Sequence, residues 1–302
     1  MYNVAVLMSS YNGEKYISHQ IESILNQKGV NVTLYIRDDG STDNTLKIIE
    51  SFKSNVVTFK NRNVGLKNSF KSLIWDKNIE ADYYAFADQD DVWDKNKLFS
   101  AIDSLSKLEG AGMYASNQRV VDSNLNFIKP LYGLEKFDLP FPTYKNFKQL
   151  FLHNNYFGNT IVLNSKTMQI LREYRPNVMV VQHDTWVSII VYMFGTIIFD
   201  PLMYSSYRQH EQNVVGGLTK PSSIIKKIQT LINKKPVYGI LADSLIVGYK
   251  KRIRNNDLNW LVLVSKLPSL SSKIKLALDK NVKDRNLYKT LVLKALIILS
   301  KF

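Results

Sequence analysis

Cysteine is absent from this 302-residue chain, and so are long apolar runs. Without cysteine the chain has no disulfide bonds, no thiolate metal site and no cysteine nucleophile, which is typical of proteins in a reducing compartment. Crossing a bilayer takes an apolar run of about 18 to 20 residues. The two nearest candidates fall short, because 186–199 is brief and contains Gly195, and 291–299 is interrupted by Lys294. The first residues also lack a secretory signal pattern, so we expect a cytoplasmic protein with no membrane-spanning helix.

Acidic residues are scarce in only one part of the chain. The net charge is +14, but residues 1–218 hold 22 Lys and Arg against 22 Asp and Glu, whereas residues 219–302 hold 18 against 4. A dense basic segment of this kind indicates an anionic partner. We therefore predict an enzyme domain at 1–218 and a basic, mainly helical C-terminal extension at 219–302. The pair Gly216-Gly217 marks the boundary between them.

The basic extension alternates apolar and basic residues, as at 224–228 and 289–296. Helices with this pattern lie on membrane surfaces, and each basic residue near an anionic leaflet contributes about 1 kcal/mol. An anionic membrane surface is therefore the partner that we expect. The alternative is a helical hairpin that packs on the enzyme domain or on the second subunit of a homodimer. Nucleic acid would not explain why the charge is confined to the extension, and no nucleic-acid module is recognisable, so we expect no such partner.

Segments typical of strands alternate with segments typical of helices in the first part of the chain, and the pattern becomes less regular after Leu108. Such alternation predicts an α/β fold with a mostly parallel central sheet and helices on both faces. The predicted strands are 4–10, 32–37, 56–59, 83–87, 113–115 and 160–163, and the predicted helices are 16–26, 43–52, 69–75, 95–108 and 185–194.

Acidic residues gather where two of these strands end. Asp38 and Asp39 end the second strand, and Asp88, Asp90 and Asp91 follow the fourth. Right-handed crossovers bring such strand ends to one edge of a sheet, which is where α/β folds bind ligands. Carboxylates there suit Mg²⁺ or Mn²⁺, which prefer oxygen ligands and bridge protein to phosphate. The alternative is helix capping, but a cap needs one acid and several are present.

Four short motifs, at 6–13, 38–43, 63–65 and 87–91, occur in the order seen in family 2 glycosyltransferases, and the chain resembles these enzymes over residues 3–215. Each motif alone is weak, whereas the combination is specific. The resemblance implies the GT-A fold. It also implies an enzyme that inverts the anomeric configuration of a nucleotide sugar in one direct displacement.

The resemblance also implies roles for individual residues. The expected donor-binding residues are Ser9, Tyr11, Glu14, Asp38, Asp39, Asn63, Lys67, Asp88 and Arg208. Asp38 and Asp39 would hold the base, and Arg208 would offset the charge of the departing diphosphate. Asp88 and Asp90 would bind a divalent metal, Mn²⁺ or Mg²⁺, with His210 completing its ligand shell.

Transfer also requires a base near the acceptor hydroxyl. The segment 182–186 resembles the family's acidic motif, which makes Asp184 the expected catalytic base. His183, Trp186 and Asn159 would lie at the acceptor site. The alternative is that Asp184 only caps the helix predicted after it.

The sequence of 87–93, together with 207–210 and 213–216, is similar to that of bacterial rhamnosyltransferases that build capsules, O-antigens and cell-wall polysaccharides. It predicts transfer of one L-rhamnose from dTDP-L-rhamnose to a lipid-linked oligosaccharide, at the inner face of a bacterial membrane. The motif Gln-x-x-Arg-Trp of processive synthases is missing, which favours a single addition. A UDP-hexose or UDP-N-acetylhexosamine donor is the alternative. A nucleotidyltransferase is disfavoured because no glycine-rich phosphate loop is present near the N-terminus.

Overall fold

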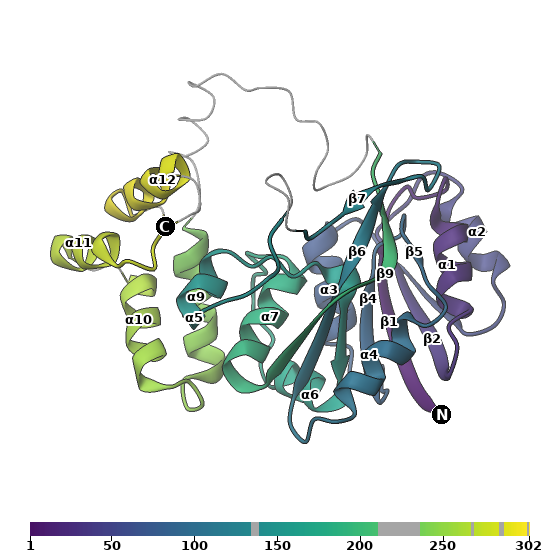
Figure 1. Ribbon diagram of the computed structural model, residues 1–302, viewed down its shortest axis with the longest axis horizontal. Helices are drawn as coiled ribbons and strands as arrows, with labels where there is room; N and C mark the ends of the chain where they lie inside the picture. The colour runs from purple at the N-terminus through teal and green to yellow at the C-terminus, as the bar shows by residue number, and fades with distance from the viewer. Residues whose placement is uncertain (134–138, 211–235, 267–268, 284–286, 301) are drawn as a thin grey trace. The chain divides into compact units, whose positions relative to one another are not determined.

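The computed structural model in Figure 1 describes residues 1–133, 139–210, 236–266, 269–283, 287–300 and 302. Unit 1 comprises Met1–Pro142, Tyr156–Glu173 and Gln182–Gly217, and unit 2 comprises Thr143–Asn155, Tyr174–Val181 and Leu218–Phe302. The domain boundary that we predicted after residue 218 lies outside the described residues and stays a prediction. Unit 2 also takes in two segments from the middle of the chain, which the sequence did not lead us to expect.

The sheet of unit 1 starts from strands whose side chains are mostly buried. These are β1 (Tyr2–Ser10), β2 (Val30–Asp38), β3 (Val56–Lys60) and β4 (Tyr83–Ala87). They pair in parallel in the order β3-β2-β1-β4, and all five residues of β4 are buried. Parallel strands covered on both faces read as nearly continuous apolar runs, which is why the sequence located them well.

The remaining strands extend the sheet with mixed directions. They are β5 (Val92–Trp93), β6 (Gly112–Val121), β7 (Phe127–Pro130), β8 (Ile161–Asn164) and β9 (Thr196–Arg208). The order continues from β4 as β8-β6-β9-β5. β8 is antiparallel to both of its neighbours, β6 and β9 are parallel, and β5 is antiparallel to β9. The pairing of β5 with β9 places the end of β9 beside the acidic segment that precedes β5.

Helices cover both faces of this sheet, as predicted (Figure 1). Alternate strand residues point to opposite faces. Val4, Val6 and Met8 of β1 pack with α1 (Ile17–Leu25), α2 (Thr45–Ser51) and α4 (Lys97–Leu105). On the other face, Phe86 of β4 contacts Phe70 of α3 (Leu66–Ile74) and His183 of α7 (His183–Phe194). The helix α6 (Ser165–Glu173) packs against α3 and α7.

In its described residues, unit 2 is mainly helical. Its helices are α5 (Phe147–Leu152), α9 (Val237–Tyr249), α10 (Asn255–Lys266), α11 (Leu270–Leu278) and α12 (Leu287–Ile298). Phe147 and Phe151 of α5 pack edge-on against the ring of Trp260, and Lys148 forms an ion pair of 2.6 Å with Asp279. These contacts join the segment 143–155 to the C-terminal helices. Among the described helices, none has both the length and the hydrophobicity needed to cross a bilayer.

Candidate active site

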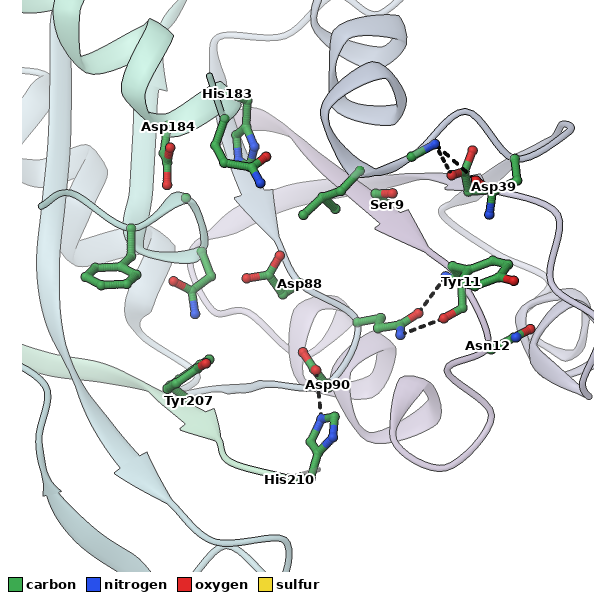
Figure 2. Close-up of a pocket in the computed structure, with 18 residues that line it drawn as sticks. Ser9, Tyr11, Asn12, Asp39, Asp88, Asp90, His183, Asp184, Tyr207 and His210 are labelled. Carbon is green, nitrogen blue, oxygen red and sulfur yellow. Dashed lines mark hydrogen bonds and ion pairs between the residues drawn. The ribbon is translucent and has the colours of Figure 1, made fainter. Parts of the chain in front are cut away.

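A cavity of about 630 Å³ opens in unit 1 where β1, β2 and β4 end (Figure 2). Most of the residues to which the sequence assigned a role line it. They are Ser9, Tyr11, Asp39, Asn63, Asp88, Asp90, Asn159, His183, Asp184 and His210. The carboxyl edge of a parallel sheet thus brings together side chains that are far apart in the chain. Glu14, Asp38, Lys67, Trp186 and Arg208 are not among the lining residues.

The end of β1 is fastened to the acidic segment by Gln89, a residue to which the sequence assigned no role. Its side-chain carbonyl accepts the N–H of Tyr11 at 2.8 Å, and its amide nitrogen donates to the carbonyl of Tyr11 at 3.0 Å. On the other side of the strand end, the hydroxyl of Ser9 donates to that of Ser69 on α3 at 2.6 Å. The position of Tyr11 and Ser9 at the cavity is therefore set by partners from β4's loop and from α3.

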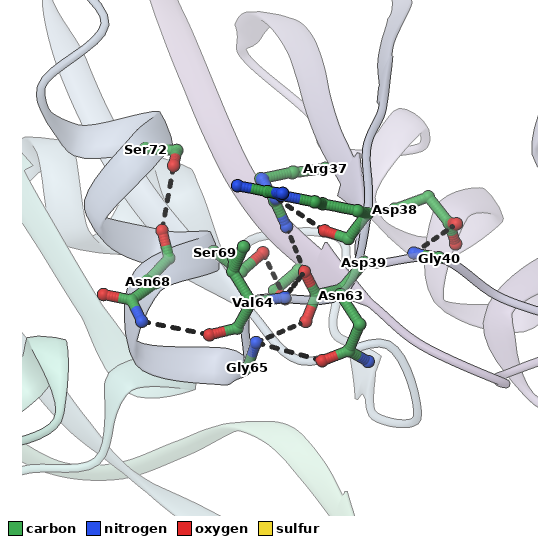
Figure 3. A network of polar contacts seen from close by, with 12 residues as sticks. Arg37, Asp38, Asp39, Gly40, Asn63, Val64, Gly65, Asn68, Ser69 and Ser72 are labelled. Carbon is green, nitrogen blue, oxygen red and sulfur yellow. Dashed lines mark hydrogen bonds and ion pairs between the residues drawn. The ribbon is translucent and has the colours of Figure 1, made fainter.

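The two acids that end β2 have different environments (Figure 3). Asp38 is buried and accepts bonds from Ser10, from Ser41 and from the N–H of Gly40, so its carboxylate holds the turn. Gly40 has a φ of 83°, which a side chain would oppose. Asp39 is also buried and is paired with Arg37.

Asp39 also organises the segment that carries Asn63. Its carboxylate accepts the N–H groups of Val64 and Gly65, at 2.9 and 2.8 Å. Arg37, its ion-pair partner, donates to the carbonyl of Arg62 at 3.2 Å (Figure 3). The Arg37–Asp39 pair therefore positions Asn63 at the cavity, while Asp39 itself faces the same space.

Glu14 and Lys67 lie outside the lining set. Glu14 accepts both the backbone N–H and the side-chain amide of Asn44, each at 2.9 Å, at the start of α2. Lys67 lies partly buried on α3. The role of Glu14 in nucleotide binding stays a prediction, since its carboxylate already serves the helix start.

The acids after β4 are crowded and largely shielded from water. Burial, together with the charges of Asp90 and Asp184, raises the pKa of Asp88 to about 7, and Lys97 opposes this rise. Burial and the charges of Asp90 and Asp88 also hold the pKa of Asp91 well above its usual range. Several carboxyls therefore lie close together where burial disfavours their charged forms, which is the environment that a cation would relieve.

Lys97 lies beneath these acids and was not found from the sequence. Its ammonium donates to the carbonyl of Asn159 and lies 3.5 Å from the ring centre of Trp93. Burial lowers the pKa of Lys97 to about 7, although Asp91, Asp88 and Asp94 oppose that change. No sequence pattern distinguishes this lysine from the exposed Lys95, because only packing decides which of them is enclosed.

The end of β9 supplies the basic groups around the acidic segment. Arg208 is buried and donates to the carbonyls of Asp90, at 2.9 Å, and Ser123, at 2.7 Å. It therefore supports the loop that bears the acids rather than facing the cavity. His210 does line the cavity, and its Nε2 lies 2.9 Å from a carboxylate oxygen of Asp90.

Asp184 and His183 line the cavity from the start of α7, and Trp186 is buried further along the same helix. Burial raises the pKa of Asp184 to about 6, against hydrogen bonds from Thr185 and from the backbone of Gly158 that favour the charged form. A carboxylate with such a pKa can accept a proton near neutrality. Figure 2 shows Asp184 on the side of the cavity opposite Tyr11 and Asp39, with Asp88 between them.

His183 is a neutral, unpaired imidazole in this wall. Its ring stacks on Phe70 with 3.7 Å between the ring centres, and burial lowers its pKa to about 3. In the part of the chain that the structure describes, neither ring nitrogen has a hydrogen-bond partner. Gly158 allows this packing, because a Cβ at that position would lie 2.4 Å from the His183 Nε2 atom. Both nitrogens are buried, so a ligand reaches them only if the ring or its neighbours move.

The residues expected to hold a metal share the cavity without forming a complete ligand set. Asp88, Asp90 and His210 all line it, but no three His, Asp or Glu side chains among the described residues converge on one ion position. Mg²⁺ commonly takes one or two carboxylates and completes its shell with water and substrate phosphates. The crowded carboxyls with their oxygen donors fit a divalent ion of this kind.

Comparison with known families decides what kind of site this is. A model described as Glycosyl transferase family 2 matches residues 5–174. The chain belongs to this family. The matched part includes both acidic strand ends, while Asp184 and His210 lie beyond it.

Among characterised relatives, the chain is 43% identical over 117 residues to a dTDP-rhamnosyl transferase, RfbG, of Shigella flexneri, covering 36% of this chain and 40% of that protein. It is 34% identical over 125 residues to WfgD of Escherichia coli, a UDP-Glc:α-D-GlcNAc-diphosphoundecaprenol β-1,3-glucosyltransferase, covering 41% of this chain and 48% of that one. The chain therefore matches less than half the length of each relative.

Solved structures agree on the fold. The crystal structure of S. aureus TarS in complex with UDP-GlcNAc is similar with a TM-score of 0.58 at 14% identity, covering 98% of this chain and 81% of that one. The mannosyltransferase PcManGT from Pyrobaculum calidifontis, in complex with GDP-Man and Mn²⁺, gives 0.51 at 12% identity, covering 99% of this chain and 74% of that one. At such identities the likeness concerns the fold alone, and it bears out the expected GT-A architecture.

Proposed function

We propose that this chain is an inverting, metal-dependent glycosyltransferase that transfers one sugar from a nucleotide sugar to a lipid-linked saccharide during bacterial polysaccharide synthesis. The observation that carries the proposal is one cavity with a buried carboxyl of raised pKa on one wall and an acidic cluster opposite. Inverting transfer needs these two features on either side of the reacting carbon.

In this reaction Asp184 acts as the general base. Its carboxylate accepts the proton of the acceptor hydroxyl while the hydroxyl oxygen forms a bond to the anomeric carbon. The bond from that carbon to the diphosphate oxygen breaks, and the nucleoside diphosphate leaves with the electron pair. His183, which is neutral and has no partner within the described chain, donates or accepts a hydrogen bond at a sugar hydroxyl.

On the donor side, Asp39 and Asn63 bind the base, and Tyr11 and Ser9 line the nucleotide pocket. Asp88, Asp90 and His210 would hold a divalent cation, which supplies positive charge next to the diphosphate. Arg208 keeps the acidic loop in place through the carbonyl of Asp90.

Our preferred donor is dTDP-L-rhamnose. The support is the 43% identity to the Shigella flexneri dTDP-rhamnosyl transferase, which extends over 36% of this chain. A UDP-sugar is the second candidate, because the Escherichia coli relative is named as using UDP-Glc. Both donors would use the same catalytic base and the same metal site. They differ in the transferred sugar, in the methyl group of the nucleobase and in the ribose 2′-hydroxyl.

A lipid-linked acceptor places the enzyme at a membrane. The 18 basic residues against 4 acidic ones in 219–302 support association with the inner, anionic face of the cell membrane. A homodimer formed through the same segment is the alternative arrangement. Neither arrangement changes the residues assigned to chemistry.

Thermal unfolding with dTDP-, UDP- and GDP-sugars, each with Mn²⁺, Mg²⁺ or chelator, tests the proposal. A ligand that binds only the folded state, at a concentration 100 times its Kd, raises the free energy of unfolding by about 2.7 kcal/mol. We therefore expect dTDP-rhamnose with metal to raise the unfolding temperature clearly. A larger shift with a UDP-sugar would replace the donor and keep the enzyme class. A panel that gives no shift, combined with no transfer to membrane extracts, would overturn the function.

A single substitution tests which residues bind the metal. Asp90→Asn should remove the metal-dependent part of the dTDP-rhamnose shift, because one anionic ligand and the partner of His210 are lost. Asp103→Asn, which changes an exposed acid on α4, is the matched control and should behave as the wild type. An unchanged, chelator-sensitive shift in Asp90→Asn would refute the assignment.

A further inference from the structure

Helix α11 of unit 2 exposes a row of apolar side chains. Leu270, Ile274 and Leu278 are 66, 46 and 75% exposed, and they follow one another at intervals of four residues. At about 100° per residue, the three fall within an arc of about 80° on the helix surface. Leu276 lies on the opposite side and is fully buried. The helix is therefore anchored in unit 2 by one face and presents an apolar face to solvent.

Helix α12, which packs against α11, repeats this arrangement. Leu291 and Ile298 are 59 and 42% exposed, and Leu299, just past the helix end, is 61% exposed. The buried side chains of the helix, Leu293, Leu296 and Ile297, lie on its other side. Single exposed apolar residues are ordinary. Rows at helical spacing on two adjoining helices mark an interaction surface.

The charges around the α11 row indicate which kind of partner this surface fits. Lys273 and Lys275 lie about 100° to either side of the centre of the row, as the helix period requires, and Lys280 and Lys283 follow the helix. The one acid of residues 269–283 is Asp279, which is paired with Lys148 at 2.6 Å. An apolar row flanked by lysines fits an anionic bilayer, where the side chains enter the acyl boundary and the ammonium groups meet the headgroups.

We propose that the exposed rows of α11 and α12 form the surface by which this protein inserts into the interface of an anionic membrane. The proposal rests on the proposed function in that a lipid-linked acceptor requires membrane contact. A second copy of the chain fits this surface less well. In a two-fold contact the lysines that flank the row of one copy would lie near those of the other, and residues 269–278 contain no acid to offset them, which is repulsive.

Site-specific labelling tests the insertion directly, because the chain has no cysteine and a single introduced one is labelled uniquely. Leu278→Cys on α11 is compared with Leu202→Cys on β9 of unit 1, since both leucines are well exposed, at 75 and 61%. Each carries a polarity-sensitive fluorophore. With phosphatidylglycerol-containing vesicles the emission at 278 should rise and shift to the blue, and that at 202 should stay constant. Pure phosphatidylcholine vesicles should change neither.

Vesicle sedimentation measures how much the row contributes. The double variant Leu270→Gln with Leu278→Gln should lower the partition coefficient for anionic vesicles by about tenfold or more, because two exposed leucines no longer enter the apolar boundary. Leu202→Gln should leave it unchanged. Retained binding in the double variant, or no binding of the wild-type protein, would overturn the proposal. So would a loss of self-association in the double variant with vesicle binding intact.

The same samples separate this proposal from the enzymatic one. Stabilisation by nucleotide sugar is measured on the wild-type protein and on the Leu270→Gln, Leu278→Gln variant, and both should respond equally. If the protein inserts into anionic vesicles but binds no nucleotide sugar, the membrane surface is supported and the proposed function is refuted. If the protein binds a nucleotide sugar but does not insert into anionic vesicles, only the proposal of the membrane surface is refuted.

Discussion

The two units of this glycosyltransferase use ionisable side chains in opposite ways. In unit 1, acids from distant parts of the chain meet in a cavity where burial raises the pKa of Asp88 to about 7 and that of Asp184 to about 6. In unit 2, lysines such as Lys275 and Lys280 stand exposed beside apolar rows. Burial turns a few groups into chemically reactive ones, whereas exposure leaves many groups that act together on a charged surface.

The net charge of a segment therefore does not show where single charged side chains have a large effect. Residues 1–218 are balanced, with 22 basic and 22 acidic residues, yet they contain the most strongly perturbed carboxyls. Residues 219–302 carry the whole excess, and in the part of them that the structure describes, lysines such as Lys250, Lys275 and Lys280 are exposed. Loss of one charge should thus have a large effect in unit 1 and a small one in unit 2, and the following changes test that contrast.

The largest effect is expected at the catalytic base. Asp184→Asn should lower the transfer rate by about 10³-fold, because the acceptor hydroxyl loses its proton acceptor. Stabilisation by the nucleotide sugar should be retained. Transfer is measured as release of nucleoside diphosphate, and donor binding by thermal unfolding. If donor binding falls in parallel with transfer, Asp184 holds the donor or the fold and is not the base.

A pair of lysine variants compares the two units directly. Lys97→Met should lower the free energy of unfolding by about 3 kcal/mol at neutral pH, since it leaves Asp88 and Asp91 buried without their cation. Lys280→Met, at an exposed site of unit 2, should change it by less than about 0.5 kcal/mol. Urea denaturation of both variants gives the comparison.

The pH dependence of the stability loss in Lys97→Met identifies the cause of that loss. Below the raised pKa values of Asp88 and Asp91 these carboxyls are protonated, so the penalty for losing the cation should shrink as the pH falls. The same penalty at acid and neutral pH would mean that Lys97 acts through packing on Trp93 instead.

The smallest effect is the pH profile of the wild-type enzyme. The base works in its charged form, and burial raises its pKa to about 6, so activity should be lost as the pH falls through 6. One unit below the pKa, kcat/KM should be about tenfold under its plateau. Vesicle binding in the same buffers is the control and should stay constant, since it depends on lysines and not on a buried carboxyl. A flat activity profile across this range would contradict the assignment of Asp184.

The parallel half of the sheet could be predicted because its strands are buried on both faces. The run 83–87 coincides with β4, and 32–37 lies within β2. The sequence did not reveal β5, β7 or β9. β9 mixes polar and apolar residues along a partly exposed strand, and β5 has only two residues, so neither carries a periodic signal.

The site was predicted where a residue type and its place at a strand end were enough. Asp39, Asp88, Asp90 and Asp184 line the cavity as expected. Glu14 and Asp38 instead bond to nearby backbone, at the start of α2 and in the turn after β2. Gln89 and Lys97 escaped notice because nothing local marks them. Their roles come from contacts with Tyr11 and Asn159, which are far away in the chain.

By itself the sequence determined the order of strands and helices in the parallel half of the sheet, the edge at which the acids emerge and the family. The first two follow from local periodicity and from the handedness of crossovers, which need no knowledge of packing. The family follows from the resemblance of four short motifs. Only the tertiary structure decided which charges are buried, which of two nearby lysines lies under the acids, and that α11 and α12 turn apolar rows outward. Desolvation depends on every neighbour in space, and neighbours in space are not neighbours in the chain.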